Sequence, residues 1–367
     1  MSDVVISGYY GFRNNGDDTL LMSIVNELRA KKPDIDIVVL SKNPEETQRV
    51  YNVRSVSREN VLSIINEIKD TKLLISGGGT LIQDGTSTKS LLYYLFIIKL
   101  AELLGKKVML FANGIGPLGS KYNRKLTKKI LNKTDIITLR DKMSQDELLD
   151  IGVTETNIYL TADPVFSLGD CGEDADGVMA ENNIPTEKPL LLISVRPWKM
   201  LKEDFCDVLA KACDYAAEKY GLYPVLLPMQ LSRDTALSAK IRAKMRFPCT
   251  VIRKENDVKK LLAIYKNTGL CIGMRLHTLI YSAVSCVPMV GLVYDPKVSG
   301  FLDYIGVDNC IEAQDVTLEY MKSAIDRALS EPDVEKIKLA ERRETLSRRA
   351  QLNTELAIGL LSEGERE

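Results

Sequence analysis

Runs of consecutive apolar residues, each followed by a helical pattern, limit the fold of this chain more than any other feature. The segment "KLLISGGG" (72–79) is almost wholly apolar until it reaches a glycine turn, and "KVMLFANG" (107–114) repeats the pattern. A strand that is apolar on both faces must be covered on both faces, as parallel strands joined by crossover helices are. The first half of the chain therefore predicts an α/β fold with a doubly wound parallel sheet.

The second half repeats this alternation after a change in composition. Residues 169–189 are acidic and rich in turn-forming residues, so we predict a linker there. It would separate a Rossmann-like domain at 1–168 from a second one at 190–330, and a C-terminal helix would occupy 331–367. Two Rossmann-like domains facing a cleft are similar in architecture to the type B glycosyltransferases (GT-B-like). Strands of the second domain are expected at 190–197, 223–229, 249–254, 270–274 and 287–294.

Composition narrows the classes of function. The 49 Lys+Arg and 50 Asp+Glu residues leave a net charge of −1, so no overall basic field indicates nucleic-acid binding. The longest apolar run, 91–98, is too short to span a bilayer, and the N-terminus lacks the basic start of a signal peptide. A single histidine and the absence of a CxxC pair argue against a metal site. We expect a cytoplasmic protein that needs no metal or other cofactor.

Two polar loops follow strands of the first half. The loop "GYYGFRNNGDD" (8–18) offers sugar hydroxyls the polar side chains of Asn14, Asn15, Asp17 and Asp18, although Asn and Asp are also common helix caps. In "SGGGTLIQDGTSTKS" (76–90), Asp84 is a candidate general base. Ligands of such sheets bind beyond the carboxyl ends of the strands, so both loops are candidate binding sites. The second loop supplies as candidate binding residues Gly78, Gly79, Gln83 and Thr86.

Two further segments have simpler interpretations. "GIGPLG" (114–119) matches GxGxxG, but Pro117 removes an N–H and the pattern is weak, which favours an ordinary turn lining the cleft. The basic segment 120–133 is most simply a solvated helix. Its alternative is contact with anionic lipid headgroups or a pyrophosphate.

Cationic side chains follow the strands of the second half. Arg196 lies in "LISVRPW" (192–198), Lys297 in "YDPKVSGF" (294–301), and Arg275 and His277, the only histidine, in "GMRLHTL" (273–279). His277 is expected near a helix N-terminus, which favours an anion. Arg140, at the end of a first-half strand, is a further candidate. This set suits a small ligand with several negative charges.

The ordered set of these motifs, with "ANGIGPLG" and "ADPVF", resembles the polysaccharide pyruvyl transferase family, and within it the bacterial CsaB type. The resemblance runs from residue 8 to about 301. It implies transfer of the enolpyruvyl unit of phosphoenolpyruvate onto a sugar as a cyclic ketal. For the CsaB type the acceptor is N-acetylmannosamine in a disaccharide on a lipid diphosphate, at the inner membrane face, and the ketal spans O4 and O6. The product belongs to secondary cell-wall polymer biosynthesis, which serves S-layer anchoring.

The resemblance also implies roles for single residues. The donor-site Arg, His and Lys of the family fall on Arg140, His277 and Lys297, with Arg196 or Arg275 as alternatives for the arginine. His277 is then the acid that protonates C3 or the partner of the phosphate, and Asp84 or Asp17 is the base. The first domain would bind the acceptor and the second phosphoenolpyruvate.

Two other functions fit the same sequence features. A nucleotide-sugar-dependent glycosyltransferase or epimerase of GT-B-like fold would use the same pair of domains. A sugar-binding protein without turnover would keep the polar loops, but the intact cationic set argues against it.

Overall fold

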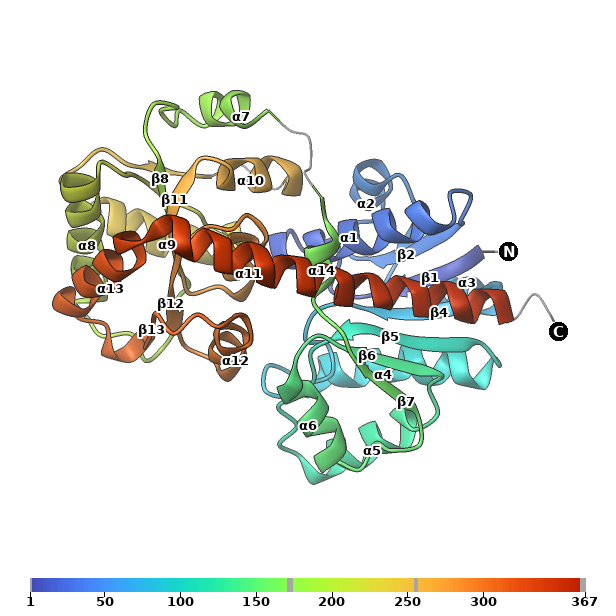
Figure 1. Ribbon diagram of the computed structural model, residues 1–367. Helices are drawn as coiled ribbons and strands as arrows, with labels where there is room; N and C mark the ends of the chain where they lie inside the picture. The colour runs from blue at the N-terminus through green and yellow to red at the C-terminus, as the bar shows by residue number, and fades with distance from the viewer. Residues whose placement is uncertain (1, 170–173, 254–256, 364–367) are drawn as a thin grey trace. The chain divides into compact units, whose positions relative to one another are not determined.

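The computed structural model describes residues 2–169, 174–253 and 257–363 and divides into two compact units (Figure 1). Unit 1 comprises the chain up to Leu168 and the segment from Leu346 onward, and unit 2 comprises Gly169–Thr345. Cys171 of the expected linker and Lys254 of the expected strand 249–254 lie outside the described residues. The predicted fold class, two doubly wound parallel-sheet domains, is confirmed.

Unit 1 contains a seven-stranded sheet of order β3-β2-β1-β4-β5-β6-β7, in which the described pairings are all parallel. Side chains of the central strands are inaccessible to solvent on both faces, which explains their unbroken apolar sequences. The strands are β1 (Ser2–Ser7), β2 (Ile37–Ser41), β3 (Arg54–Ser57), β4 (Thr71–Gly77), β5 (Lys107–Asn113), β6 (Ile136–Leu139) and β7 (Asn157–Leu160).

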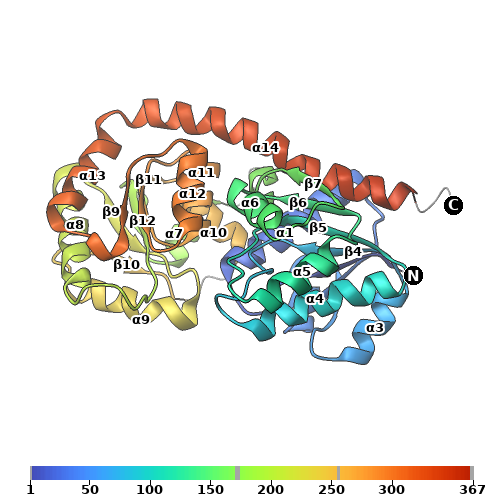
Figure 2. The same ribbon diagram turned by 90° about the horizontal axis from the view of Figure 1, so that it is seen from below.

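Two apolar cores cover the two faces of this sheet. Val5 belongs to the core beneath α3, α4, α5 and α6, whereas its neighbours Val4 and Ile6 belong to the core beneath α1 and the end of α14. Figure 2 shows α3, α4 and α5 side by side. The helices of unit 1 are α1 (Asn15–Lys31), α2 (Pro44–Tyr51), α3 (Val61–Lys69), α4 (Thr88–Leu103), α5 (Lys121–Leu131), α6 (Lys142–Asp150) and the one-turn η1 (Pro164–Ser167).

Unit 2 repeats the strand order. Its sheet runs β10-β9-β8-β11-β12-β13, with parallel pairing throughout the described strands. The strands are β8 (Leu190–Ser194), β9 (Tyr223–Leu226), β10 (Thr250–Val251), β11 (Thr268–Gly273), β12 (Met289–Val293) and β13 (Cys310–Glu312). The helices are α7 (Ala175–Glu181), α8 (Phe205–Tyr220), α9 (Leu231–Arg242), α10 (Val258–Tyr265), α11 (Leu276–Val284), α12 (Pro296–Ile305), η2 (Ala313–Asp315), α13 (Leu318–Ser330) and α14 (Pro332–Glu363).

The expected linker contains structure that its composition does not reveal. Within 169–189, α7 forms and packs against α10, so this part of the segment belongs to unit 2. Asp174 caps α7 by accepting a hydrogen bond from the Asp176 amide, so the acidic residues that suggested a linker partly serve as a helix start.

The last helix also differs from a simple terminal extension. From Leu346 onward α14 groups with unit 1, where Ala357, Leu360 and Leu361 join the core beneath α1. The Asn353 amide is buried and donates to the Ala162 carbonyl at 3.2 Å, while its oxygen accepts from the Thr161 hydroxyl at 2.8 Å. Although α14 has 32 residues, no helix within the described ranges is both long and apolar enough to cross a bilayer.

Replacing Asn353 with Leu should therefore destabilise unit 1 although the new side chain is more apolar. The change removes the side-chain donor of the Ala162 carbonyl, which costs about 1–3 kcal/mol, whereas the Thr161 hydroxyl keeps its hydrogen bond to the Leu139 carbonyl at 3.1 Å. Urea unfolding measures the loss of unfolding free energy. The control is Glu355→Ala, which removes one exposed ion pair with Lys31 and should cost less than about 1 kcal/mol. Equal effects of the two substitutions would contradict the packing described for α14.

Candidate functional site

In both sheets the chain connections change direction beside the first strand. In unit 1 the connections from β1 and β4 lead in opposite directions, and in unit 2 those from β8 and β11 do the same. Ligands of doubly wound sheets bind at this switch point. The loops that follow these four strands contain most of the residues selected from the sequence.

The two polar loops of unit 1 meet at Asp17 and Gly79. Asn14 caps α1 and donates a short hydrogen bond from its amide to the Asp17 carboxylate. Gly79 has a φ of +75°, and a Cβ added to it would lie 3.1 Å from the Asp17 carboxylate. Gly78 likewise has a positive φ, of +61°. The glycines therefore permit a close approach that brings the predicted acceptor residues Asn14, Asp17 and Gly79 together.

The remaining acceptor candidates of unit 1 lie differently. Asn15 is fully buried in the first turn of α1. Gln83 and Thr86 bond to each other, with the Thr86 amide donating to the Gln83 side-chain oxygen at 2.9 Å. They shape the loop before α4, and their binding of a sugar stays a prediction.

Asp84, a predicted base, holds the start of α5. Its carboxylate accepts hydrogen bonds from the Gly119 amide at 2.8 Å, the Ser120 amide at 3.1 Å and the Asn123 side chain at 2.7 Å. Desolvation alone would raise the pKa of Asp84, but these hydrogen bonds outweigh it and the pKa lies below its ordinary value. A carboxylate stabilised in this way is a weak base, and the geometry gives Asp84 a structural function.

Asp18 has the opposite electrostatics, although in the sequence it is only one of several polar residues of the first loop. Desolvation, followed by the charges of Asp17 and Glu46, raises the pKa of the Asp18 carboxyl to about 8. A carboxyl with such a pKa exchanges a proton near neutral pH, which suits an acid–base catalyst. The pair of adjacent aspartates was the only signal in the sequence.

The 114–119 loop is a supporting turn. The Gly114 amide donates to the Gly79 carbonyl at 2.8 Å, and the Gly116 amide donates to the Ile82 carbonyl at 2.8 Å. These amides are therefore engaged with the second polar loop, which agrees with the interpretation as a turn rather than a dinucleotide site.

Arg140, a predicted donor-site residue, is buried in unit 1. Its guanidinium donates to the Asp163 carboxylate at 2.8 Å and to the Thr80 hydroxyl at 3.1 Å. It thereby connects the loops that follow β4, β6 and β7. Asp163, which the sequence analysis did not select individually, neutralises its charge.

Two of the four cationic residues predicted in unit 2 lie together at Tyr294. The Arg196 guanidinium lies 4.8 Å from the centre of the Tyr294 ring and donates to its hydroxyl at 3.0 Å. Lys297 Nζ lies 5.9 Å from the same ring, and Trp198 packs against it edge-on. Tyr294 thus organises two of the predicted cations, and only its place in the "YDPK" motif could have indicated this.

The cations predicted in unit 2 differ in how far neighbouring carboxylates neutralise their charge. Among the described residues Arg196 has no carboxylate partner, and its buried Nε–H donates no hydrogen bond to any of them. Lys297, with 36% of its side chain exposed, lies 3.4 Å from Asp295. Arg275 is paired with the fully buried Asp234, which leaves it little charge for a ligand.

His277 is the second residue of α11, directly beyond the end of β11. It is partly buried, and its ring centre lies 6.2 Å from that of Tyr281. Arg275 precedes the helix without capping it through its side chain. Arg196 follows β8, His277 follows β11 and Lys297 follows β12. Because β11 lies between β8 and β12, the three residues follow neighbouring strands of the sheet.

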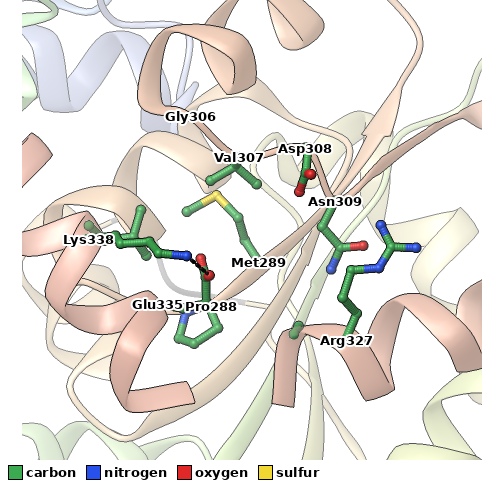
Figure 3. A pocket seen from close by; sticks show the side chains of 11 residues that line it. Pro288, Met289, Gly306, Val307, Asp308, Asn309, Arg327, Glu335 and Lys338 are labelled. Carbon is green, nitrogen blue, oxygen red and sulfur yellow. Dashed lines mark hydrogen bonds and ion pairs between the residues drawn. The ribbon is translucent and has the colours of Figure 1, made fainter. Parts of the chain in front are cut away.

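A separate cavity of about 170 Å³ lies at the amino-terminal ends of β12 and β13, away from the loops described above (Figure 3). Met289 at the start of β12 lines it, as do Arg327 and an ion pair between Glu335 and Lys338. It contains none of the predicted site residues. In the described part of the chain, no group of three or more His, Cys, Asp or Glu side chains is arranged to hold a metal ion.

The family model of polysaccharide pyruvyl transferases matches residues 14–296, which is more than half of the chain. The chain belongs to the polysaccharide pyruvyl transferase family. The amylovoran biosynthesis protein AmsJ of Erwinia amylovora is 21% identical over 83% of this chain and 86% of its own length.

Solved structures similar to this pyruvyl transferase family member share its fold. A putative UDP-N-acetylglucosamine 2-epimerase from Listeria monocytogenes has a TM-score of 0.64 and 13% identity, with 96% of this chain and 94% of that one covered. A glycosyltransferase from Rickettsia africae has a TM-score of 0.63 and 12% identity, with 100% and 97% covered. At these identities the similarity concerns the fold alone.

Arg140→Ala should destabilise the protein by about 3–5 kcal/mol, because it leaves the buried Asp163 carboxylate without its partner. Lys297→Ala removes a partly exposed pair and should cost less than about 1 kcal/mol. Denaturant unfolding compares the two, and Arg140→Ala/Asp163→Ala should recover part of the loss. A cost for Arg140→Ala no larger than that for Lys297→Ala would contradict the structural role.

Asp18 should make stability depend on pH. Its pKa of about 8 in the folded state lies above the unfolded value, so the folded state binds the extra proton and stability falls as pH rises from about 4 to 8. Asp18→Asn should therefore stabilise the protein at pH 9 by on the order of 5 kcal/mol relative to the wild type, and by much less at pH 5. Thermal melts of the variant and the wild type at each pH measure this stabilisation. A stabilisation of the same size at pH 5 and pH 9 would refute the raised pKa of Asp18.

Proposed function

We propose that this protein transfers the enolpyruvyl group of phosphoenolpyruvate onto a sugar and closes it as a cyclic ketal, with release of phosphate. The observation that carries the proposal is that Arg196, His277 and Lys297 follow the neighbouring strands β8, β11 and β12 of unit 2, with Arg196 and Lys297 both at the Tyr294 ring, in a member of the pyruvyl transferase family.

Phosphoenolpyruvate, with a phosphate and a carboxylate, requires several cations. Arg196 retains its charge because no carboxylate of the described residues pairs with it, and its planar guanidinium suits bidentate binding. Arg275 and Arg140 are neutralised by buried aspartates. We therefore assign donor binding to Arg196, Lys297 and His277, with the other two arginines holding the loops in place.

The acceptor in this proposal is a sugar bound by the loops of unit 1. Asn14, Asp17 and the backbone at Gly79 supply hydrogen-bonding groups at the switch point. The name of AmsJ, a protein of amylovoran biosynthesis, supports a saccharide acceptor. Following the CsaB type, we propose N-acetylmannosamine of a disaccharide on a lipid diphosphate, modified at O4 and O6 at the cytoplasmic membrane face for cell-wall polymer synthesis.

The reaction needs one acid and one base. A sugar hydroxyl gives its proton to the base as its oxygen adds to C2 of phosphoenolpyruvate, while C3 gains a proton from the acid. The C2–O bond to phosphate then breaks, and the second hydroxyl closes the ring and loses its proton. We assign His277 as the acid for C3 or the partner of the phosphate. Asp17 or Asp18 is the base, because Asp84 is engaged by three donors.

The test is incubation with phosphoenolpyruvate and a lipid-linked disaccharide, followed by mass spectrometry for the added pyruvyl ketal and by a phosphate assay. His277→Ala should lower turnover by at least about 10²-fold, the usual contribution of acid–base catalysis. Lys297→Ala should raise the donor KM more than the acceptor KM. Normal phosphate release by His277→Ala would refute its assignment.

A nucleotide-sugar-dependent glycosyltransferase or epimerase is the alternative with the same fold. It predicts thermal stabilisation by a UDP-sugar, whereas the proposed function predicts stabilisation by phosphoenolpyruvate. Stabilisation by the UDP-sugar alone, with no ketal formed, would decide for the alternative.

A further inference from the structure

The solvent-facing side of α4 is apolar where a surface helix is normally polar. Leu92, Phe96 and Leu103 are exposed to 38%, 45% and 73%, and their spacing places them on one stripe of the helix. The opposite side of α4 packs on the sheet through Leu91, Leu95 and other core residues. The stripe therefore lies outside the core of unit 1.

The neighbouring helices extend this stripe into a face. On α3, Leu62 is 75% exposed, and on α5 Tyr122 is 70% exposed. Both helices contact α4 (Figure 2). On the far side of α5, Arg124 pairs with Glu147 and Asp150 of α6. Helical periodicity consequently places Tyr122 and Lys129 on the side of α5 nearer α4.

The charges around the apolar residues are positive. α5 contains no acidic residue in "KYNRKLTKKIL", and Lys121, Lys125 and Lys129 are exposed. Glu102 on α4 is paired with Lys99 at 2.8 Å, and Glu67 on α3 with Arg54 at 3.4 Å. This face thus combines exposed apolar side chains with cations that no acid of α5 neutralises.

We propose that this face, formed by α3, α4 and α5, binds the surface of an anionic phospholipid bilayer. Apolar side chains that reach the acyl boundary, bordered by lysines at headgroup level, are the pattern of peripheral membrane-binding helices. A protein partner of matching shape would need its own acidic rim. A bilayer supplies negative charge along the whole length of α5.

The position of the face fits the acceptor proposed above. The loop 78–87 at the unit 1 switch point leads directly into α4, so this surface begins next to the acceptor loop. The connection to a lipid-linked acceptor rests on the proposed function, whereas the exposed residues and charges do not depend on it.

The test is sedimentation of the full chain with vesicles of phosphatidylglycerol and phosphatidylcholine, compared with vesicles of phosphatidylcholine alone. Wild-type protein should bind the anionic vesicles more tightly, and added salt should weaken this binding. Lys125→Gln/Lys129→Gln should lower the affinity roughly 20- to 30-fold, at about fivefold for each lysine. Leu92→Glu/Phe96→Glu should lower it at least tenfold.

Matched substitutions on α2 control for changes of charge and apolarity elsewhere. Arg49 and Val50 are both exposed there, and Arg49→Gln/Val50→Glu should leave vesicle binding unchanged. Equal binding of the control and the α4 variant would overturn the proposal. A wild-type dimer in light scattering that becomes a monomer on Leu92→Glu/Phe96→Glu, without vesicle binding, would instead identify a second copy as the occupant.

Turnover separates this proposal from the proposed function. With a water-soluble short-chain acceptor, Leu92→Glu/Phe96→Glu should retain wild-type phosphate release. If the wild-type protein turns over the acceptor but binds no vesicles, the proposed membrane binding is refuted and the proposed pyruvyl transfer is not. Vesicle binding without turnover of any acceptor would refute the pyruvyl transfer alone.

Discussion

The reversal of direction in each sheet determines where this molecule can bind a ligand. Chain connections leave β1 and β4, and likewise β8 and β11, toward opposite sides, so the carboxyl ends of these strands are not covered by a crossover. The polar groups of each loop that begins there must find hydrogen-bond partners within the loops themselves. Residues such as Asn14, which caps a helix and also binds the Asp17 carboxylate, therefore have a structural and a chemical function at once.

Buried ion pairs then separate the cations that hold the loops from those available to a ligand. Arg140 and Arg275 each donate to a buried aspartate, and removing one partner of such a pair costs far more than removing an exposed one. Arg196 is instead stacked on Tyr294, an arrangement that orients a guanidinium without neutralising it. Three arginines that look equivalent in the sequence thus have unequal charge to offer a ligand.

The sequence indicated the strands with continuous apolar runs, because burial on both faces leaves that pattern. It missed β3, "RSVS", and β13, "CIE", which lie at sheet edges where side chains are partly exposed. It located the site loops, since strand ends can be counted. It could not pair Arg140 with Asp163 or Arg275 with Asp234, because such contacts across 23 and 41 residues depend on which strands become neighbours.

The return of α14 to unit 1 has a consequence for biosynthesis. The core beneath α1 includes Ala357, Leu360 and Leu361, which are synthesised only after the whole of unit 2. Part of the apolar surface of the N-terminal sheet therefore stays uncovered until the whole of unit 2 and the end of α14 have been synthesised. A nascent chain of this kind depends on protection from aggregation for the duration of its own translation.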